Sequence, residues 1–431
     1  MGIKNMKKKN VVIGLLLSLS VALSAAGSVF AAGGSPIVIG VPTALGSIEG
    51  RDTLFIVRMA AEEINQKGGV IVGGEKRPLE VVSIDTRGHE AGIPVHDALT
   101  AVEKLILEKK PHAILVGAFR SEILLASMDL IAKYKIPYIC TIAMSPAFQK
   151  KVAENYDKYK YMFRMCLDAR YFVMYLTKLM DFLNKEFGFN KAYIVAQDVL
   201  WARGSGKVLQ KLLPKQGWEI AGFDTYPIGS TDYSSSLIKV RMKKAHVIVP
   251  IGDMPQLAIL SKQSRAMKVP ALLAGEIAAL CSQSSWAATE GAVEGFLNFI
   301  FEAGNIPVKS IPKSQVFHRN FGKRYGQKAL ENLSGHGPGP SYDSVYALAA
   351  AIERAGTLEP DPVVKALEQT DMDGAIGHIK FSKDHQVIFG FDPKKTALGV
   401  VIQWRKPGIR VPVFPEVVSE GKIELPPYMK K

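Results

Sequence analysis

Short apolar segments alternate with amphipathic segments along most of the chain, and this alternation limits the possible folds more than any other feature. Residues 37–41 and 113–117 are short apolar runs of the kind that form buried strands. Between them, apolar residues from Leu54 to Ile64 fall on one helical face, and residues 95–108 predict a second helix. Strands that alternate with helices form a parallel sheet covered on both faces. We therefore expect an α/β protein.

The same pattern returns after residue 160 and predicts a second domain of the same kind. Further strands are predicted at 79–85, 138–141, 192–196 and 247–250, and further helices over 121–134, after Trp201, over 256–266 and over 342–354. The polar residues 151–160 predict a surface loop, and the proline-rich tail after Trp404 predicts irregular chain on the surface. The 431 residues suffice for two domains.

The N-terminus predicts export. Four lysines within residues 4–9 precede an apolar run over 11–26, and Val29-Phe30-Ala31 places small residues at the −3 and −1 positions of a cleavage site after Ala31. The alternative is an uncleaved membrane anchor. The formal charge of +14 is compatible with nucleic-acid binding, but the lysines are scattered, which favours a basic exported protein that binds no nucleic acid.

The motifs of common catalytic and metal sites are missing from the sequence. No GxSxG, HExxH or complete phosphate-binding loop occurs, and the first strand is not followed by GxGxxG. The three cysteines, Cys140, Cys166 and Cys281, form no CxxC pair, so spacing argues against a zinc or redox site, and an odd count leaves at least one free thiol. We expect neither an enzyme, nor a bound metal, nor a cofactor.

Ligands of parallel α/β sheets bind beyond the carboxyl ends of the strands. The turns that follow the predicted strands are therefore the candidate binding segments. They cover residues 42–51, 118–122, 142–145, 198–203, 252–254 and 275–277.

Several segments resemble one known family. The run Ala61-Glu62-Glu63-Ile64-Asn65 with Gly68-Gly69 behind it is similar to the first helix of the branched-chain amino-acid binding proteins of ABC importers, in the type I periplasmic binding protein family. Further similar segments follow in the family's order at 161–164, 232–237, 290–295, 342–346, 351–356 and 376–381. The resemblance spans residues 37 to about 404.

The resemblance implies two parallel-sheet α/β lobes joined by three crossover segments, with the ligand in the cleft between them. One lobe would hold residues 36–163 and 299–374, and the other 164–298 and 375–405. Residues 1–31 would be the signal peptide, and 406–431 a proline-rich tail. The implied function is capture of a branched-chain or related amino acid in the periplasm and delivery to ABC transporter permease subunits.

The family's carboxylate site maps onto the turns after the third and fourth strands. Ser121 matches the family's serine, with capping of its own helix as the alternative role. Ala143, Met144 and Ser145 match the second segment, where Met144 replaces a threonine that many members carry. The lost hydroxyl favours a more apolar contact with the ligand.

The remaining candidates surround the rest of the ligand. Trp201 matches an aromatic position that stacks on the ligand or covers the cleft. Glu276 lies near the family's ammonium-binding acid, with an exposed surface acid as the alternative, and Asp253 is a second candidate for that charge. Tyr342 lines the cleft or belongs to the core. Arg120 offers a fork for a second carboxylate or is solvated.

Two other functions stay open. Related receptors take amides, urea or aromatic carboxylates, and such a ligand would drop the ammonium contact. A sensor that signals through a membrane partner would keep the fold and the cleft but not the transporter.

Overall fold

The computed structural model describes residues 34–90 and 92–429. The predicted signal peptide, residues 1–31, lies outside these residues. Within the described part of the chain, no helix combines the length and the apolar character that a membrane crossing requires.

The first sheet has five strands in the order β4-β1-β5-β6-β7, and all of its neighbours run parallel. Its strands are β1 (Ile37–Thr43), β4 (Leu79–Asp85), β5 (Ala113–Val116), β6 (Tyr138–Cys140) and β7 (Met162–Arg164). β5, β6 and β7 are buried along their whole length, so they consist of apolar residues apart from Arg164 at the end of β7. A separate hairpin joins β2 (Val70–Val72) to β3 (Glu75–Arg77).

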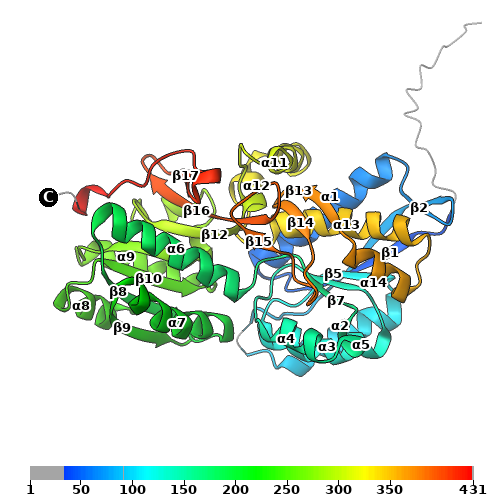
Figure 1. The fold of residues 1–431 in the computed structure, drawn as a ribbon, viewed down its shortest axis with the longest axis horizontal. Coiled ribbons are helices and arrows are strands. Elements are labelled where there is room, and N and C mark those ends of the chain that lie inside the picture. Colours follow the sequence, from blue (N-terminus) through cyan, green and yellow to red (C-terminus); the bar gives the residue numbers. More distant parts are fainter. Residues whose placement is uncertain (1–33, 91, 430–431) are drawn as a thin grey trace, which may run out of the picture. The chain divides into compact units, whose positions relative to one another are not determined.

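Helices cover both faces of this sheet (Figure 1). One side carries α2 (Val95–Lys109), α3 (Ser121–Tyr134), α4 (Ala147–Glu154) and α5 (Tyr156–Tyr159). The other side carries α1 (Ile48–Gln66), which packs against α13 (Pro338–Ala355), and α13 packs in turn against α14 (Pro360–Glu368). α11 (Pro312–Tyr325) also packs against α1 and α13, and the short α12 (Gln327–Glu331) packs against α11. The sheet therefore collects segments far apart in sequence.

The second sheet follows the order β13-β14-β16-β12-β11-β10-β8-β9, with β15 and β17 also paired to β16. Its parallel part contains β8 (Lys191–Gln197), β9 (Glu219–Tyr226), β10 (Val247–Gly252), β11 (Leu272–Ile277) and β12 (Leu297–Glu302). Its antiparallel part contains β13 (Asp371–Gly374), β14 (Gly377–Lys380), β16 (Ala397–Arg405) and β17 (Ile409–Phe414), while β15 (Phe389–Gly390) runs parallel to β16. The predicted second α/β unit is confirmed.

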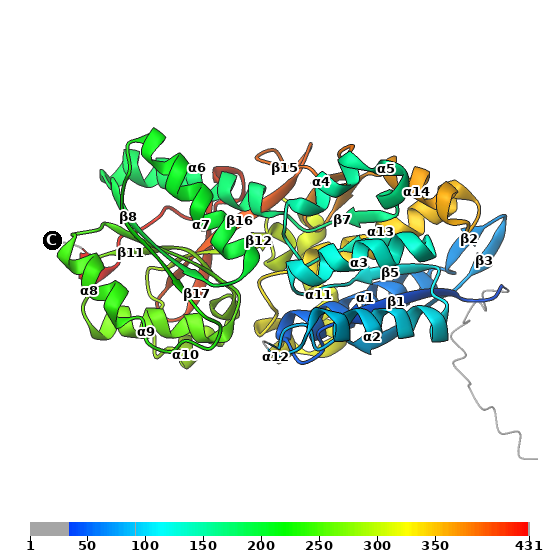
Figure 2. The same cartoon turned by 90° about the horizontal axis from the view of Figure 1, so that it is seen from below.

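Helices also cover both faces of the parallel part of this sheet (Figure 2). One side carries α6 (Ala169–Phe187) and α7 (Leu200–Leu212), which pack against each other. The opposite side carries α8 (Ser234–Met242), α9 (Ile259–Ala266) and the short α10 (Ser285–Ala288). α6 begins where Asp168 accepts hydrogen bonds from the Arg170 and Tyr171 N–H groups and ends at Gly188, which adopts the left-handed conformation that favours glycine.

Two local predictions were wrong. Residues 151–160 were expected to form a loop, but most of them belong to α4 and α5, because Phe148, Val152 and Tyr159 bury one face of an otherwise charged segment. The tail after Trp404 was expected to lie irregularly on the surface, but β17 pairs antiparallel with β16 and buries Val413.

The chain passes between the two sheets three times. The first passage joins β7 to α6, the second follows β12, and the third leads from α14 into β13 and β14. The boundary expected at residues 298 and 299 falls inside β12, which continues to Glu302. A division of the chain by sheets therefore falls after Glu302, where β12 ends.

A buried acid of α13, which holds the turn between β13 and β14, makes stability depend on pH. Both oxygens of Asp343 accept hydrogen bonds, from Ala375 N–H at 2.8 Å and Ile376 N–H at 3.0 Å. Burial nevertheless raises the pKa of Asp343 from 3.8 to about 7. A raised carboxyl pKa contributes stability that is fully present below the unfolded value of 3.8 and is lost as the pH rises through about 7.

We expect the Asp343→Asn variant to lose less stability than the wild type between pH 5 and pH 8. Between pH 5 and pH 8, the unfolding free energy of the wild type should fall by about 2.6 kcal/mol relative to that of the variant, given the pKa change from 3.8 to about 7. Denaturant unfolding at each pH measures it, and the exposed Glu80→Gln serves as control. Parallel pH curves for wild type and Asp343→Asn would contradict the assignment.

Candidate functional site

A small closed cavity lies where the carboxyl ends of strands from both sheets meet. Its volume is about 20 Å³, which is room for about one water molecule. The residues that line it are Glu49, Phe119, Ser121, Ile142, Ala143, Met144, Trp201, Asp253, Ala278, Phe301 and His336. The first sheet contributes the residues up to Met144, and the second contributes Trp201, Asp253 and Ala278. This is the position that strand topology predicts for a ligand site.

The first sheet presents Ser121 and the loop after β6 to the cavity. Ser121 is the first residue of α3, and its Oγ accepts a hydrogen bond from Ser145 N–H at 3.1 Å. Arg120 holds the N-cap position without a side-chain capping bond, so the alternative that Ser121 caps its helix is wrong. Ala143 and Met144 line the cavity, whereas Ser145 lines a neighbouring apolar hollow that also contacts Trp201.

The second sheet presents an aromatic and acidic pair. Trp201 packs edge-on against Phe172 and Phe301, and its indole Nε1 donates to Asp253 Oδ2 at 2.8 Å. The other Asp253 oxygen is buried and has no hydrogen-bond partner in the described chain. Burial raises the pKa of Asp253, and the Trp201 hydrogen bond opposes that rise. These contacts fix the Trp201 ring at the cavity, with its Nε1 edge towards Asp253.

Two further acids lie close to Asp253. Glu276 in β11 is fully buried and is not among the residues that line the cavity. It accepts one hydrogen bond from Gly252 N–H at 3.3 Å, and its Oε1 has no partner among the described residues. The alternative of an exposed Glu276 is therefore wrong. Burial and the neighbouring Asp253 and Glu49 raise the pKa of Glu276 well above its usual range. Burial raises the pKa of Glu49 to about 7, and Asp253 adds to that rise.

His336 and Glu302 extend the site towards the passages between the sheets. The His336 ring stacks at a tilt on Phe301, and its Nε2 lies 2.6 Å from the Ile142 carbonyl oxygen. Burial lowers the pKa of His336, but Glu302, 3.3 Å from Nδ1, together with the Ile142 carbonyl and Glu49, raises it by more. Glu302 Oε1 also accepts from Leu167 N–H at 3.0 Å. These contacts connect the cavity to two of the three passages.

Sequence analysis did not identify Glu49, His336, Phe301 or Glu302. Glu49 lies within the candidate segment 42–51, where it was the acid that could have been singled out. His336 precedes α13 and follows no strand, so the rule that pointed to strand ends could not find it. Phe301 and Glu302 lie at the end of β12. No strand was predicted there, so its end was not among the candidate segments.

Two predicted site residues lie elsewhere. Arg120 is half-buried, and its Nη2 donates to the Ile93 carbonyl oxygen at 2.7 Å instead of facing the cavity. Tyr342 is a buried residue of α13 whose hydroxyl donates to Glu63 Oε2 at 2.6 Å and whose ring packs against Phe317. Its placement matches the core alternative. Neither residue is among those that line the cavity.

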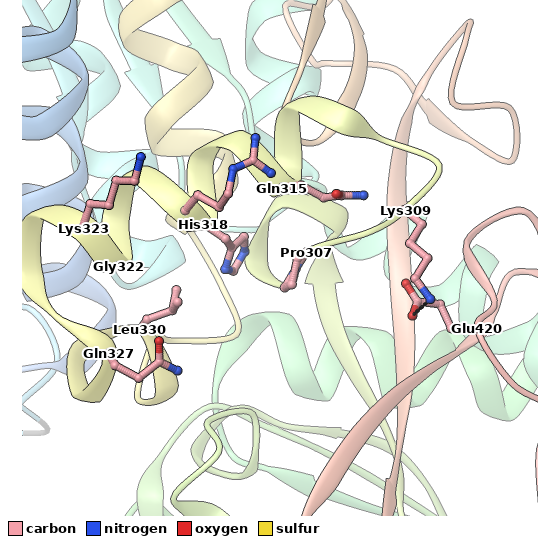
Figure 3. A pocket seen from close by; sticks show the side chains of 10 residues that line it. Pro307, Lys309, Gln315, His318, Gly322, Lys323, Gln327, Leu330 and Glu420 are labelled. Atoms are coloured by element: carbon pink, nitrogen blue, oxygen red, sulfur yellow. Dashed lines mark ion pairs between the residues drawn. The ribbon is translucent and has the colours of Figure 1, made fainter.

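A wider hollow of about 640 Å³ lies over α11 and α12 (Figure 3). Figure 3 shows Lys309 turned towards Glu420, with which it forms an ion pair of 3.0 Å. Lys323 and Gln327 also line this hollow, which follows no strand end of either sheet. An open, polar depression of this kind lacks the convergent buried groups of the small cavity.

Comparison with known proteins agrees with this architecture. The model of the family described as periplasmic binding protein matches residues 36–391. A putative branched-chain amino acid ABC transporter protein from Silicibacter pomeroyi has a similar structure, with a TM-score of 0.78 and 20% identity over 91% of this chain and 100% of that one.

Two other similar structures are described as complexes. The branched-chain amino acid transporter substrate-binding protein LivJ from Streptococcus pneumoniae, in complex with isoleucine, has a TM-score of 0.69 and 19% identity over 87% of this chain and 97% of its own. An ABC transporter solute-binding protein from R. palustris, in complex with benzoate, has a TM-score of 0.68 and 15% identity over 90% of this chain and 98% of its own. These structures share the two-sheet fold with the present chain. The family match covers most of the sequence, and the chain belongs to the periplasmic binding protein family.

Proposed function

We propose that the protein captures a branched-chain or related amino acid in the cavity between the two sheets and delivers it to the permease of an ABC importer. The single observation that carries this proposal is that acidic groups and the start of a helix meet at one cavity. Glu49 and Asp253 line it, and Glu276 is close enough to both for its pKa to be raised by them. Ser121, the first residue of α3, lines it as well.

The three carboxyl groups suit a ligand ammonium. Two of them, Asp253 and Glu276, each keep a buried oxygen without a hydrogen-bond partner in the described chain. Asp253 and Glu49 both raise the pKa of Glu276, and Asp253 raises that of Glu49, because like charges in a poorly solvated site repel. An ammonium group would neutralise part of this repulsion and supply N–H donors to the unpartnered oxygens.

The N-terminus of α3 suits a ligand carboxylate. The first N–H groups of a helix have no partners within it, and the helix dipole favours an anion there. Ser121 adds a hydroxyl, and Met144 and Phe119 add apolar contacts. An amino acid presents a carboxylate, an ammonium and an apolar side chain in a fixed arrangement, which corresponds to these three kinds of wall.

Opening of the cavity accompanies binding in this proposal. A volume of about 20 Å³ admits no amino acid, so the two units move apart to admit the ligand and close over it. We propose the lobes as residues 36–163 with 299–374 and 164–298 with 375–405, the second boundary adjusted to the end of β12 at Glu302. Export through the signal peptide of residues 1–31 places the protein in the periplasm, and no chemical change of the ligand is involved.

The competing ligand class is an aromatic or amine-free carboxylate. The R. palustris relative is described with benzoate, and the Trp201 and Phe301 rings would suit such a ligand. The acid-rich wall disfavours it, because an anion next to three carboxyl groups gains no charge partner. Arg120, the cation expected to balance a second carboxylate, is engaged by Ile93.

A ligand panel tests the proposal. Leucine, 4-methylpentanoate, isoamylamine and benzoate separate the contributions of ammonium, carboxylate and ring. We expect leucine to raise the melting temperature of the ligand-stripped protein, since a ligand at about 100 times its Kd stabilises by roughly 2.7 kcal/mol. 4-Methylpentanoate, which lacks the ammonium, and isoamylamine, which lacks the carboxylate, should raise the melting temperature much less.

The variants Ser121→Ala and Asp253→Asn, with the exposed Glu186→Gln as control, assign the two ends of the ligand. The first two should weaken leucine binding in calorimetric titration, and the control should not. Stabilisation by 4-methylpentanoate or benzoate without any by leucine would refute the amino-acid proposal. Transport is tested separately, by loss of uptake on deletion of the gene; uptake that persists while ligand signalling is lost would favour the sensor.

A further inference from the structure

Three donor side chains from three separate segments converge beside the cavity. Cys166 follows β7, Glu302 ends β12, and His336 precedes α13. All three are buried, and the Cys166 sulfur, a Glu302 oxygen and a His336 ring nitrogen lie within 4.8 Å of one another. Because the three segments are distant in sequence, no motif spacing reveals this cluster, and the absence of CxxC says nothing about it.

The orientation of His336 leaves a lone pair aimed into the cluster. Its Nε2 lies 2.6 Å from the Ile142 carbonyl oxygen, which only accepts, so Nε2 carries the proton and donates. In the neutral ring Nδ1 is then an acceptor, and it faces Glu302 Oε2 at 3.3 Å. Two acceptors at this distance require a proton or a cation between them. A backbone carbonyl that holds the remote N–H is also the usual support of a metal-binding histidine.

Glu302 is held in place by hydrogen bonds, whereas the Cys166 sulfur makes only a long contact with a carbonyl oxygen. Glu302 Oε1 accepts from Leu167 N–H at 3.0 Å and Oε2 from Asn305 Nδ2 at 2.7 Å, which orients the carboxylate without using all its lone pairs. The Cys166 sulfur lies 3.9 Å from the Ala143 oxygen, a contact too long to be a strong hydrogen bond for the thiol. A thiolate in this position would be free to bind a metal.

We propose that Cys166, Glu302 and His336 bind one Zn²⁺ ion. Thiolate, carboxylate and neutral imidazole are the donors that zinc prefers. One thiolate and one carboxylate together balance the charge of Zn²⁺, as a buried ion requires. Tetrahedral bonds of ~2.0–2.3 Å place donor atoms roughly 3.4–3.8 Å apart, so the present cluster needs to contract by about 1 Å. Binding releases the thiol proton to solvent.

The ion would connect the passages between the sheets. Cys166 belongs to the first passage and Glu302 to the start of the second, while His336 also lines the ligand cavity. Three protein ligands leave a fourth position open. The proposal does not depend on which solute the cavity takes, and its test uses no solute.

Cobalt titration of the metal-free full chain tests the site. Co²⁺ replaces Zn²⁺ in tetrahedral sites and gives a thiolate-to-metal charge-transfer band. We expect one Co²⁺ per chain with that band, displaced by one equivalent of Zn²⁺. Cys166→Ser should abolish the band and His336→Gln should weaken binding at least tenfold, whereas Cys281→Ser, a buried cysteine outside the cluster, should leave both unchanged.

The wild-type spectrum decides the question even where a variant fails to fold. A wild-type protein that stays folded and shows no band would mean that only a proton lies between His336 and Glu302, and would overturn the proposal. Retention of the band in folded Cys166→Ser, or its loss in folded Cys281→Ser, would place the thiolate elsewhere and overturn it equally.

Discussion

Replacement of Arg164 by leucine should lower the free energy of unfolding by about 3–5 kcal/mol, the range seen when a buried ion pair loses one partner. Arg164 ends β7 and is fully buried, although it carries a permanent charge. Its Nε donates to Gln386 Oε1 at 2.7 Å, and its Nη1 donates to the carbonyl oxygens of Ala143 and Ser145 at 3.0 and 2.9 Å. A leucine would leave all three acceptors without these donors.

The charge of Arg164 is balanced by Asp168, which is also fully buried. The Arg164 Nη2 lies 3.5 Å from Asp168 Oδ2, and the guanidinium stacks over the Phe148 ring at 4.9 Å. Asp168 keeps its N-cap hydrogen bonds and its contact with Arg170 in the variant, so α6 still begins there. The first passage loses its anchor to the segment between β14 and β15, because Gln386 lies in that segment.

The matched control is Arg324→Leu. Arg324 makes a bidentate pair with Glu62 at 2.9 and 3.0 Å, but both side chains are about half exposed. Exposed pairs contribute only about 0–1 kcal/mol. Denaturant unfolding compares the two variants directly. Equal small losses in both would contradict the anchoring role of Arg164; a second variant, Arg164→Lys, should be intermediate, since one ammonium cannot reach all three acceptors.

Elements with a single clear periodicity were predictable from sequence. The helix expected over 121–134 begins at Ser121 and ends at Tyr134, and the strand expected at 79–85 is β4. α4 and α5 were missed because only a few apolar residues mark their buried face, and the rest of the segment is largely polar and charged. β17 was missed because prolines surround it, although its place at the edge of the sheet tolerates them.

The candidate site was predictable where it follows strand ends. Ser121, Ala143, Met144, Trp201 and Asp253 all line the cavity, and each lies in a turn selected for that reason. His336 reaches the cavity from a loop whose position depends on the packing of α13 against α1. No local pattern encodes such packing. Tyr342 shows the converse: its helix was correctly expected, but which face of α13 it occupies depends on Glu63, across the helix pair.

Replacement of Glu276 by glutamine should weaken binding of an amino-acid ligand about 100-fold and at the same time stabilise the ligand-free protein. The expected loss of affinity corresponds to about 3 kcal/mol, within the range for truncating one partner of a buried charge pair. Leucine is the test ligand, and calorimetric titration measures the change. The exposed Glu186→Gln should bind leucine as the wild type does.

The gain in stability follows from the sign of the pKa shift. Burial, with Asp253 and Glu49 nearby, raises the folded-state pKa of Glu276 well above its unfolded value of 4.5. The stability that this group contributes is fully present below pH 4.5 and is lost as the pH rises through the folded-state pKa. Glutamine cannot ionise, so it escapes this loss, and its amide oxygen can take the place of the Glu276 Oε2 that accepts from Gly252 N–H. At pH 8 we expect a gain of ~1–2 kcal/mol.

Opposite effects on binding and stability distinguish a ligand-binding acid from a structural one. A structural Glu276 would be stabilising, so its replacement would lower the melting temperature and weaken binding only through damage to β11 and its neighbour β10. A glutamine variant that is less stable than the wild type at pH 8 would therefore contradict the role assigned here. A variant that is more stable but binds leucine unchanged would mean that Glu276 makes no contact with the ligand. The ammonium would then be bound by Asp253 and Glu49.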